Sequence, residues 1–144
     1  MNDGNRRHGP KRPNGFTLIE LLIVMVILGL LAALVAPKMF QKVGSSKQKA
    51  AKAQIAMFAT ALDAYRLDVG NYPDADQGLE GLRKNPGKDT WDGPYLPKDI
   101  PPDPWGKPYV YRFPGEHGDY DLLSLGADGE EGGEGENADV ASWE

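Results

Sequence analysis

The C-terminal part of the chain concentrates residues that could bind a hard metal ion. From Pro114 onward there are ten Asp or Glu residues and no Lys or Arg, and residues 126–135 contain five glycines. Calcium takes about six to eight oxygen ligands from carboxylates and backbone carbonyls, and glycine lets carbonyls converge. The EF-hand pattern is not met, since Asp128 is followed two residues later by Glu130. The residues leave two interpretations open: a specific calcium site, or a solvated acidic loop.

Residues suited to catalysis are few. The chain has two histidines, His8 and His117, and no cysteine. Ser124 and His117 could form a triad with an aspartate, but no nucleophile-elbow motif surrounds Ser124. The sequence therefore predicts no enzyme activity, and we expect His117 to lie in a loop where its ring packs or hydrogen-bonds locally.

One further acidic group lies in an apolar segment near the N-terminus. Residues 16–36 are almost entirely apolar apart from Glu20. At 1.5 Å per residue they make about 31 Å of helix, which matches a hydrocarbon core of about 30 Å. A carboxylate in such a segment costs about 2.5–3.5 kcal/mol on insertion scales, so Glu20 requires a compensating partner.

Basic residues before this segment predict its orientation. Arg6, Arg7, Lys11 and Arg12 outweigh Asp3, which places the N-terminus in the cytoplasm and the rest of the chain outside. A conventional cleaved signal peptide fits poorly, because the apolar region is long and residues 37–40 lack a small-x-small cleavage site. A plain signal anchor leaves Glu20 unexplained.

The junction between the two segments resembles type IV prepilins and pseudopilins. Residues 15–20 read GFTLIE after a short basic leader, which is the signature of those proteins. The resemblance implies cleavage between Gly15 and Phe16 by a prepilin peptidase, followed by N-methylation of Phe16. It also implies that Glu20 pairs with the new α-amine of a neighbouring subunit during assembly, so that two buried charges satisfy each other.

A second apolar pattern predicts an amphipathic helix that continues from the first. Residues at alternating steps of three and four make one stripe, which we interpret as the core of the domain, and Gly70 supplies the stop. We expect a single helix over residues 16–69, with Pro37 as a possible bend. The stripe consists of Ile55, Phe58, Leu62, Tyr65 and Val69.

The remaining residues predict a small antiparallel sheet. Residues 70–108 are rich in turn formers and include a possible short helix at 78–83. Residues 109–113 and 120–125 are the two best strand candidates, and residues 114–119 read as a hairpin loop. The predicted fold class is α+β, a pilin-like fold with a long N-terminal helix packed on this sheet. The expected divisions are 1–15 (leader), 16–36 (membrane or filament-core helix), 37–69 (amphipathic continuation) and 70–144 (globular part).

Motifs in the second half resemble the major pseudopilins of type II secretion. They include GNYP at 70–73, GPYL at 93–96, DPWG at 103–106 and SLGADG at 124–129. Ordinary type IV pilins usually close a loop with cysteines, which this chain lacks. The resemblance implies a Ca²⁺ cofactor in the C-terminal loop, with the side chains of Asp128 and Asp139 and the carbonyls of Leu125 and Asn137 as ligands. It leaves Glu134 and Glu136 open.

The resemblance also implies a structural function. The chain would be the major subunit of a pseudopilus, a periplasmic helical fibre that drives folded proteins across the outer membrane. Its implied partners are further copies of itself, minor pseudopilins, an inner-membrane assembly platform and ATPase, and prepilin peptidase. The implied location is the inner membrane, single-pass, with a cytoplasmic N-terminus and a periplasmic C-terminal domain.

Two other functions stay open on the sequence alone. They are a type IV pilus subunit and a membrane-anchored calcium-dependent binding module. Nucleic acid is not an expected partner, because removal of the leader leaves twelve Lys and Arg against twenty Asp and Glu, a net charge of −8.

Overall fold

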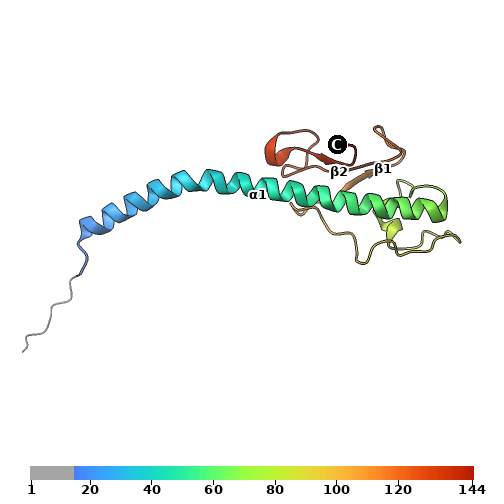
Figure 1. Ribbon diagram of the computed structural model, residues 1–144, viewed down its shortest axis with the longest axis horizontal. Helices are drawn as coiled ribbons and strands as arrows, with labels where there is room; N and C mark the ends of the chain where they lie inside the picture. The colour runs from blue at the N-terminus through green and yellow to red at the C-terminus, as the bar shows by residue number, and fades with distance from the viewer. Residues whose placement is uncertain (1–14) are drawn as a thin grey trace, which may run out of the picture. The chain divides into compact units, whose positions relative to one another are not determined.

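The computed structural model describes residues 15–144, so the predicted leader, residues 1–15, lies outside the described residues except for Gly15. The first element is a helix, α1 (Leu18–Val69), which runs without interruption through Pro37 (Figure 1). The chain divides into an N-terminal unit that ends at Lys38 and a second compact unit, residues 39–144. The long helix expected from the sequence is confirmed, but it begins at Leu18 because Thr17 caps its N-terminus.

The end of α1 follows from local chemistry. Gly70 has a φ of +93°, a left-handed conformation that glycine adopts without steric cost, and its N–H bonds to the Arg66 carbonyl at 2.8 Å. Arg66 itself lies in the last turn, where a positive charge complements the helix dipole. The chain then turns back, so that the segment after α1 can cover one side of the helix.

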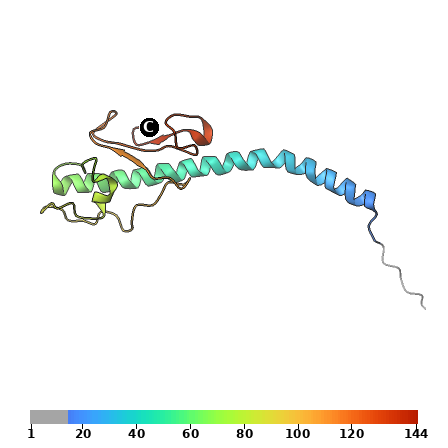
Figure 2. The ribbon, with the colours of Figure 1, turned by 180° about the vertical axis from the view of Figure 1, so that it is seen from behind.

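Within the second unit, the C-terminal part of α1 (residues 39–69) lies between two segments of the chain. In Figures 1 and 2 the yellow segment after α1 follows one side of the helix, and the orange and red C-terminal segment follows the other. The yellow segment contains a short 3₁₀ helix, η1 (Gly78–Leu82), where the sequence predicted a short helix at 78–83. The red segment contains a second 3₁₀ turn, η2 (Gly135–Asn137).

The sheet has three antiparallel strands in the order β1-β2-β3. The predicted hairpin is present as β1 (Val110–Arg112) and β2 (Asp121–Ser124), with Tyr111 opposite Leu122. The third strand, β3 (Val140–Ala141), pairs with β2 and was not predicted. Two residues are too few to show an alternating pattern, and the strand depends on pairing with a distant part of the chain. Together these elements confirm the predicted α+β fold class.

The core lies where the apolar stripe of α1 meets the loops and the sheet. Phe58 and Leu62 have no exposed surface, and Tyr65 is 1% exposed. The Phe58 ring meets Tyr109 edge-on with ring centroids 5.1 Å apart, a favourable geometry for aromatic pairs. The stripe is therefore the domain core, as the sequence predicted. Buried apolar residues from outside the helix complete it: Leu79, Leu82, Leu96, Leu122 and Val140.

Candidate assembly site and acidic loop

The N-terminal unit presents an apolar surface on every side of the helix. The large apolar residues between Phe16 and Val35 are exposed in the single chain. Helix α1 contains an 18-residue window with a mean hydropathy of 3.0 that is 0% buried, so the helix is long and apolar enough to cross a membrane. Exposed apolar surface of this extent requires a membrane or other helices around it.

Glu20 makes a reciprocal cap at the start of α1. Its Oε2 accepts the backbone N–H of Thr17 at 2.7 Å and the Thr17 hydroxyl at 2.9 Å. The Thr17 hydroxyl oxygen in turn accepts the Glu20 N–H at 3.3 Å. This is a capping box, in which Thr at the N-cap and Glu three residues later satisfy otherwise unpaired donors. The T-x-x-E pattern at residues 17–20 is the local sequence signal for this cap, which the assembly role implied for Glu20 does not include.

The capping box does not replace the predicted pairing of Glu20. The contacts to Thr17 engage Oε2, and a carboxylate offers about four lone-pair sites across its two oxygens. Glu20 also remains at the outermost turn of the helix, where the amine of Phe16 would lie after cleavage. The described residues therefore place Gly15, Phe16 and Glu20 together at one end, and the pairing between subunits stays a prediction.

The acidic loop, residues 125–139, folds back on itself through backbone hydrogen bonds. The Ala127 N–H bonds to the Glu136 carbonyl at 2.9 Å, and the Asp139 N–H bonds to the Gly132 carbonyl at 3.2 Å. Two glycines are required where the chain crosses itself. A Cβ on Gly126 would lie 2.7 Å from the Asn137 carbonyl oxygen, and one on Gly133 would lie 2.6 Å from it. Both glycines also have positive φ angles.

The predicted metal ligands lie in this loop, and hydrogen bonds satisfy only some of their oxygen atoms. Asp139 Oδ2 accepts the Gly132 N–H at 2.9 Å, whereas Asp139 Oδ1 is buried without a hydrogen-bond partner among the described residues. Asp128 Oδ1 accepts the Glu130 N–H at 3.1 Å. The Leu125 carbonyl accepts the Gly129 N–H at 3.2 Å. Asp139 therefore carries an acceptor that a cation would satisfy.

The chemistry of this donor set fits a hard cation. Within residues 15–144 no three His, Cys, Asp or Glu side chains come together as a metal-binding group. A site here would therefore need backbone carbonyls and water beside two carboxylates. Calcium accepts such mixed oxygen ligands in flexible geometry, whereas zinc prefers nitrogen and sulfur.

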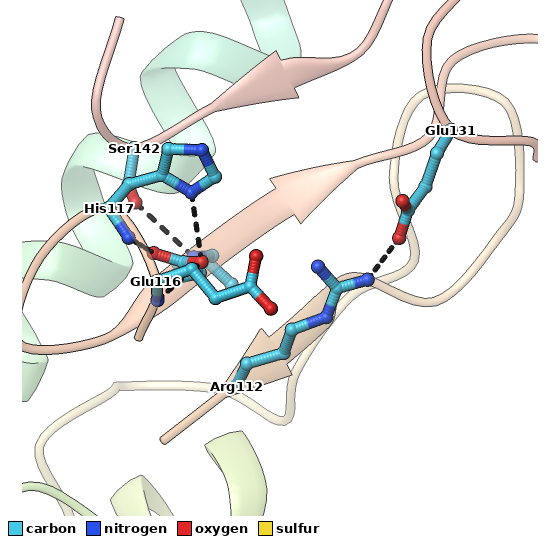
Figure 3. A network of polar contacts seen from close by, with 7 residues as sticks. Arg112, Glu116, His117, Glu131 and Ser142 are labelled. Carbon is cyan, nitrogen blue, oxygen red and sulfur yellow. Dashed lines mark hydrogen bonds and ion pairs between the residues drawn. The ribbon is translucent and has the colours of Figure 1, made fainter. Parts of the chain in front are cut away.

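A second polar network joins the hairpin loop to the C-terminus (Figure 3). Asp121 is completely buried, and its carboxylate accepts the backbone N–H groups of Glu116 at 3.0 Å and His117 at 3.1 Å. The His117 Nδ1 lies 3.0 Å from Asp121 Oδ2, and its ring stacks on Trp143 with centroids 4.0 Å apart. Burial raises the pKa of Asp121, but the hydrogen bonds from His117 and Glu116 outweigh it and leave that pKa below its usual value.

These contacts bear on the possible triad. The Ser124 hydroxyl donates to Asp103 Oδ2 at 2.6 Å, and both residues are buried. His117 instead contacts Asp121, at the other end of β2. Ser124 and His117 thus have separate partners, and His117 packs locally as the sequence predicted. Sequence reasoning missed the two buried aspartates, Asp103 and Asp121, since a pattern of polar residues in loops does not reveal which are enclosed.

Comparison with known proteins gives the family. Residues 38–143 match the family described as "Type II secretion system (T2SS), protein G", and residues 10–36 match the "Prokaryotic N-terminal methylation motif". Two proteins named type II secretion system core protein G are close in sequence. The one from Pseudomonas aeruginosa is 47% identical over 93% of this chain and 97% of that protein, and the one from Vibrio cholerae is 43% identical over 92% and 93%.

A solved structure agrees with the fold. The crystal structure of the major pseudopilin from the type 2 secretion system of enterohaemorrhagic Escherichia coli matches with a TM-score of 0.60 and 30% identity. The match covers 74% of this chain and 95% of that chain. The chain therefore belongs to the protein G family of type II secretion systems.

Proposed function

We propose that this protein is the major structural subunit of a type II secretion pseudopilus. The observation that carries the proposal is an exposed apolar helix that directly follows an N-methylation motif, in a chain of the protein G family. Copies would associate through residues 16–36, and the globular parts would face outward. A head-to-tail contact that does not close on itself generates a helical fibre of this kind. The role is structural and needs no catalytic residue.

The processing steps follow from the same segment. Prepilin peptidase cleaves between Gly15 and Phe16, and methylation of the new N-terminus leaves an amine that is cationic at neutral pH, since its reference pKa is about 7.7–8.0. Before assembly the chain is held in the inner membrane, with a cytoplasmic N-terminus and a periplasmic C-terminal domain. An assembly ATPase and its membrane platform add copies at the base, and minor pseudopilins complete the fibre.

Glu20 links the helix to its neighbour. In the single chain the capping box holds its carboxylate near the helix start. In the fibre the same carboxylate pairs with the Phe16 amine of the next subunit, so that neither charge stays unpaired in apolar surroundings. Loss of one partner from a buried charge pair costs about 3–5 kcal/mol, because it leaves an uncompensated charge.

The assembly role of Glu20 can be tested by fibre yield. The chain is expressed with the secretion machinery, cells are sheared, and released fibres are imaged and quantified. We expect Glu20→Gln to reduce the yield at least about tenfold. Loss of the charge pair should cost each subunit contact more than about 1.4 kcal/mol, which corresponds to a factor of ten in the association constant. Glu80→Gln, which removes an exposed carboxylate on η1, should leave the yield unchanged. Equal yields from both variants would contradict the pairing.

We further propose that the acidic loop binds Ca²⁺. Asp128 and Asp139 would provide carboxylate oxygens, Leu125 and Asn137 carbonyl oxygens, and water the remainder. The buried Asp139 Oδ1 supports this choice, because an unpaired buried acceptor is costly unless a ligand satisfies it. A bound cation would also offset the repulsion among the acidic residues of the loop.

Calcium removal tests this proposal directly. The full chain in detergent is melted with a chelator and with excess calcium. A ligand that binds only the folded state stabilises it, by about 2.7 kcal/mol at one hundred times its Kd, and the Tm rises as a result. We expect the rise in the wild type and in Asp89→Asn, an exposed control, and its loss in Asp139→Asn. An identical Tm for the wild type in both conditions would defeat the proposal.

The alternatives raised by the sequence are not favoured. The family match covers the globular part, residues 38–143, and it names type II secretion rather than a type IV pilus. A membrane-anchored binding module would leave the exposed apolar helix within the bilayer and would form no fibre.

A further inference from the structure

A lysine from outside the acidic loop donates to its backbone. Lys107 Nζ donates to the Gly126 carbonyl oxygen at 3.4 Å and also to the Ala127 carbonyl oxygen. A Cβ built on Gly129 would lie 3.0 Å from the same ammonium group. The ammonium therefore lies against the first turn of the loop, residues 125–129, rather than in open solvent.

The backbone of Lys107 is fixed by a buried aspartate. Its N–H donates to Asp103 Oδ1 at 2.8 Å, and its carbonyl accepts the Asp103 N–H at 2.7 Å. Asp103 is 3% exposed, and its Oδ2 accepts the Ser124 hydroxyl at 2.6 Å. Ser124 immediately precedes the loop, and its oxygen accepts the Gly126 N–H at 3.4 Å. The turn at 103–107 thus contacts the start of the loop at two points.

The lysine ammonium lies against a loop that is strongly acidic. Residues 125–139 contain six Asp or Glu residues and no Lys or Arg. Two cations reach the loop from the preceding segment: Lys107, and Arg112, which pairs with Glu131 (Figure 3). The Arg112 pair is exposed on both sides, so solvent and salt screen it. The Lys107 contacts are partly buried and directed at carbonyls, and such hydrogen bonds from a charged donor are stronger.

We propose that Lys107 is a positioning residue for the calcium loop. It holds the turn at 125–129 in place before metal binds, so that the Leu125 carbonyl and the Asp128 carboxylate are already aligned. The carbonyls that it engages, those of Gly126 and Ala127, are not in the predicted ligand set, so the ammonium does not occupy a ligand position. This inference rests on the proposed calcium site.

Two effects of the lysine charge oppose each other. A fixed positive charge near a cation site repels the cation and weakens its binding. A fixed hydrogen-bond donor that already orders the loop lowers the entropy cost of binding and strengthens it. Groups that orient metal ligands typically change metal affinity about 10–100-fold when they are removed. Since the dipoles of two carbonyl groups partly compensate the ammonium charge, we infer that the positioning effect is larger.

The experiment compares Lys107→Met with Lys107→Arg in the full chain in detergent. Lys88→Met, which removes an exposed lysine, is the matched control. Hydrogen exchange of residues 125–139 is followed in chelator, with the protected amides of residues 55–65 as the internal reference for global folding. Calcium affinity is then measured by titration with calcium chloride.

We expect Lys107→Met to speed exchange of the loop in chelator and to weaken calcium affinity about tenfold. Lys107→Arg should keep loop exchange and calcium affinity close to the wild-type values, and Lys88→Met should behave as the wild type. Unchanged loop exchange, unchanged affinity or tighter affinity in Lys107→Met would each overturn the proposal. A wild type that binds no calcium would instead defeat the calcium site itself, so the two failures are distinguishable.

Discussion

At the scale of single residues, Asp121 decides whether the hairpin loop and the C-terminus stay together. Its buried carboxylate accepts the backbone N–H groups of Glu116 and His117 and contacts the His117 ring. The His117 ring in turn stacks on Trp143. Ser142, in the turn after β3, adds a contact between the C-terminus and β2, since its hydroxyl oxygen accepts the Leu122 N–H at 3.2 Å. Asp121 therefore holds the hairpin loop directly and the C-terminus through the His117 ring.

Acid should destabilise the fold through this residue. The pKa of Asp121 is lower in the folded chain than in the unfolded chain, where it is about 3.9. Its contribution to stability is therefore present above about pH 4 and is lost as the pH falls through the lower, folded value. Asp121→Asn should lower stability at neutral pH by about 1–3 kcal/mol and flatten the dependence below pH 4.

Denaturant unfolding between pH 2 and 7 measures this effect. Asp89→Asn serves as the control, because Asp89 is exposed. If Asp121→Asn kept the full acid dependence of the wild type, another carboxylate would be responsible.

Several residue roles were accessible from sequence and others were not. GFTLIE and SLGADG are local motifs, and the family resemblance that they carry implied the roles of Gly15, Phe16, Glu20 and the loop ligands. The enclosure of Asp103 and Asp121 depends on contacts across many residues, and a single sequence does not encode burial of a loop carboxylate in any local pattern. Lys107 was missed for the same reason.

At the scale of elements, α1 was the most predictable part of the fold. Its apolar stripe repeats at helical spacing, and four of its five residues are buried in the core, while Val69 packs against the edge of that core. The strands were harder, because β1 and β2 are only three and four residues long. β3 has no local signal at all, since its two residues form a strand only by pairing with Leu123 and Ser124.

The stripe predicts where substitutions in α1 will be costly. Phe58 is completely buried and packs on Tyr109, so Phe58→Ala should destabilise the domain by about 3–5 kcal/mol through the cavity that it leaves. Leu67 lies on the same helix but is 85% exposed, and Leu67→Ala should change stability by less than about 0.5 kcal/mol. Denaturant unfolding of both variants measures the difference, and similar losses would contradict the assigned core face.

At the scale of the whole molecule, helix α1 runs through two units, one with an exposed apolar surface and one with a buried core. The unit that ends at Lys38 exposes apolar residues and requires a membrane or neighbouring helices. The second unit buries its own core without a disulfide, since the chain has no cysteine. This division matches the requirements of a subunit that first resides in a bilayer and then enters a fibre.

The central claim is that the processed chain is the subunit of a fibre. The most direct measurement is purification of sheared fibres from cells with the secretion machinery, followed by mass spectrometry of the N-terminal peptide and electron microscopy of the same sample. The account predicts helical fibres built from chains that begin at N-methylated Phe16. A chain that keeps Met1, or that stays in the membrane fraction without fibres, would contradict it.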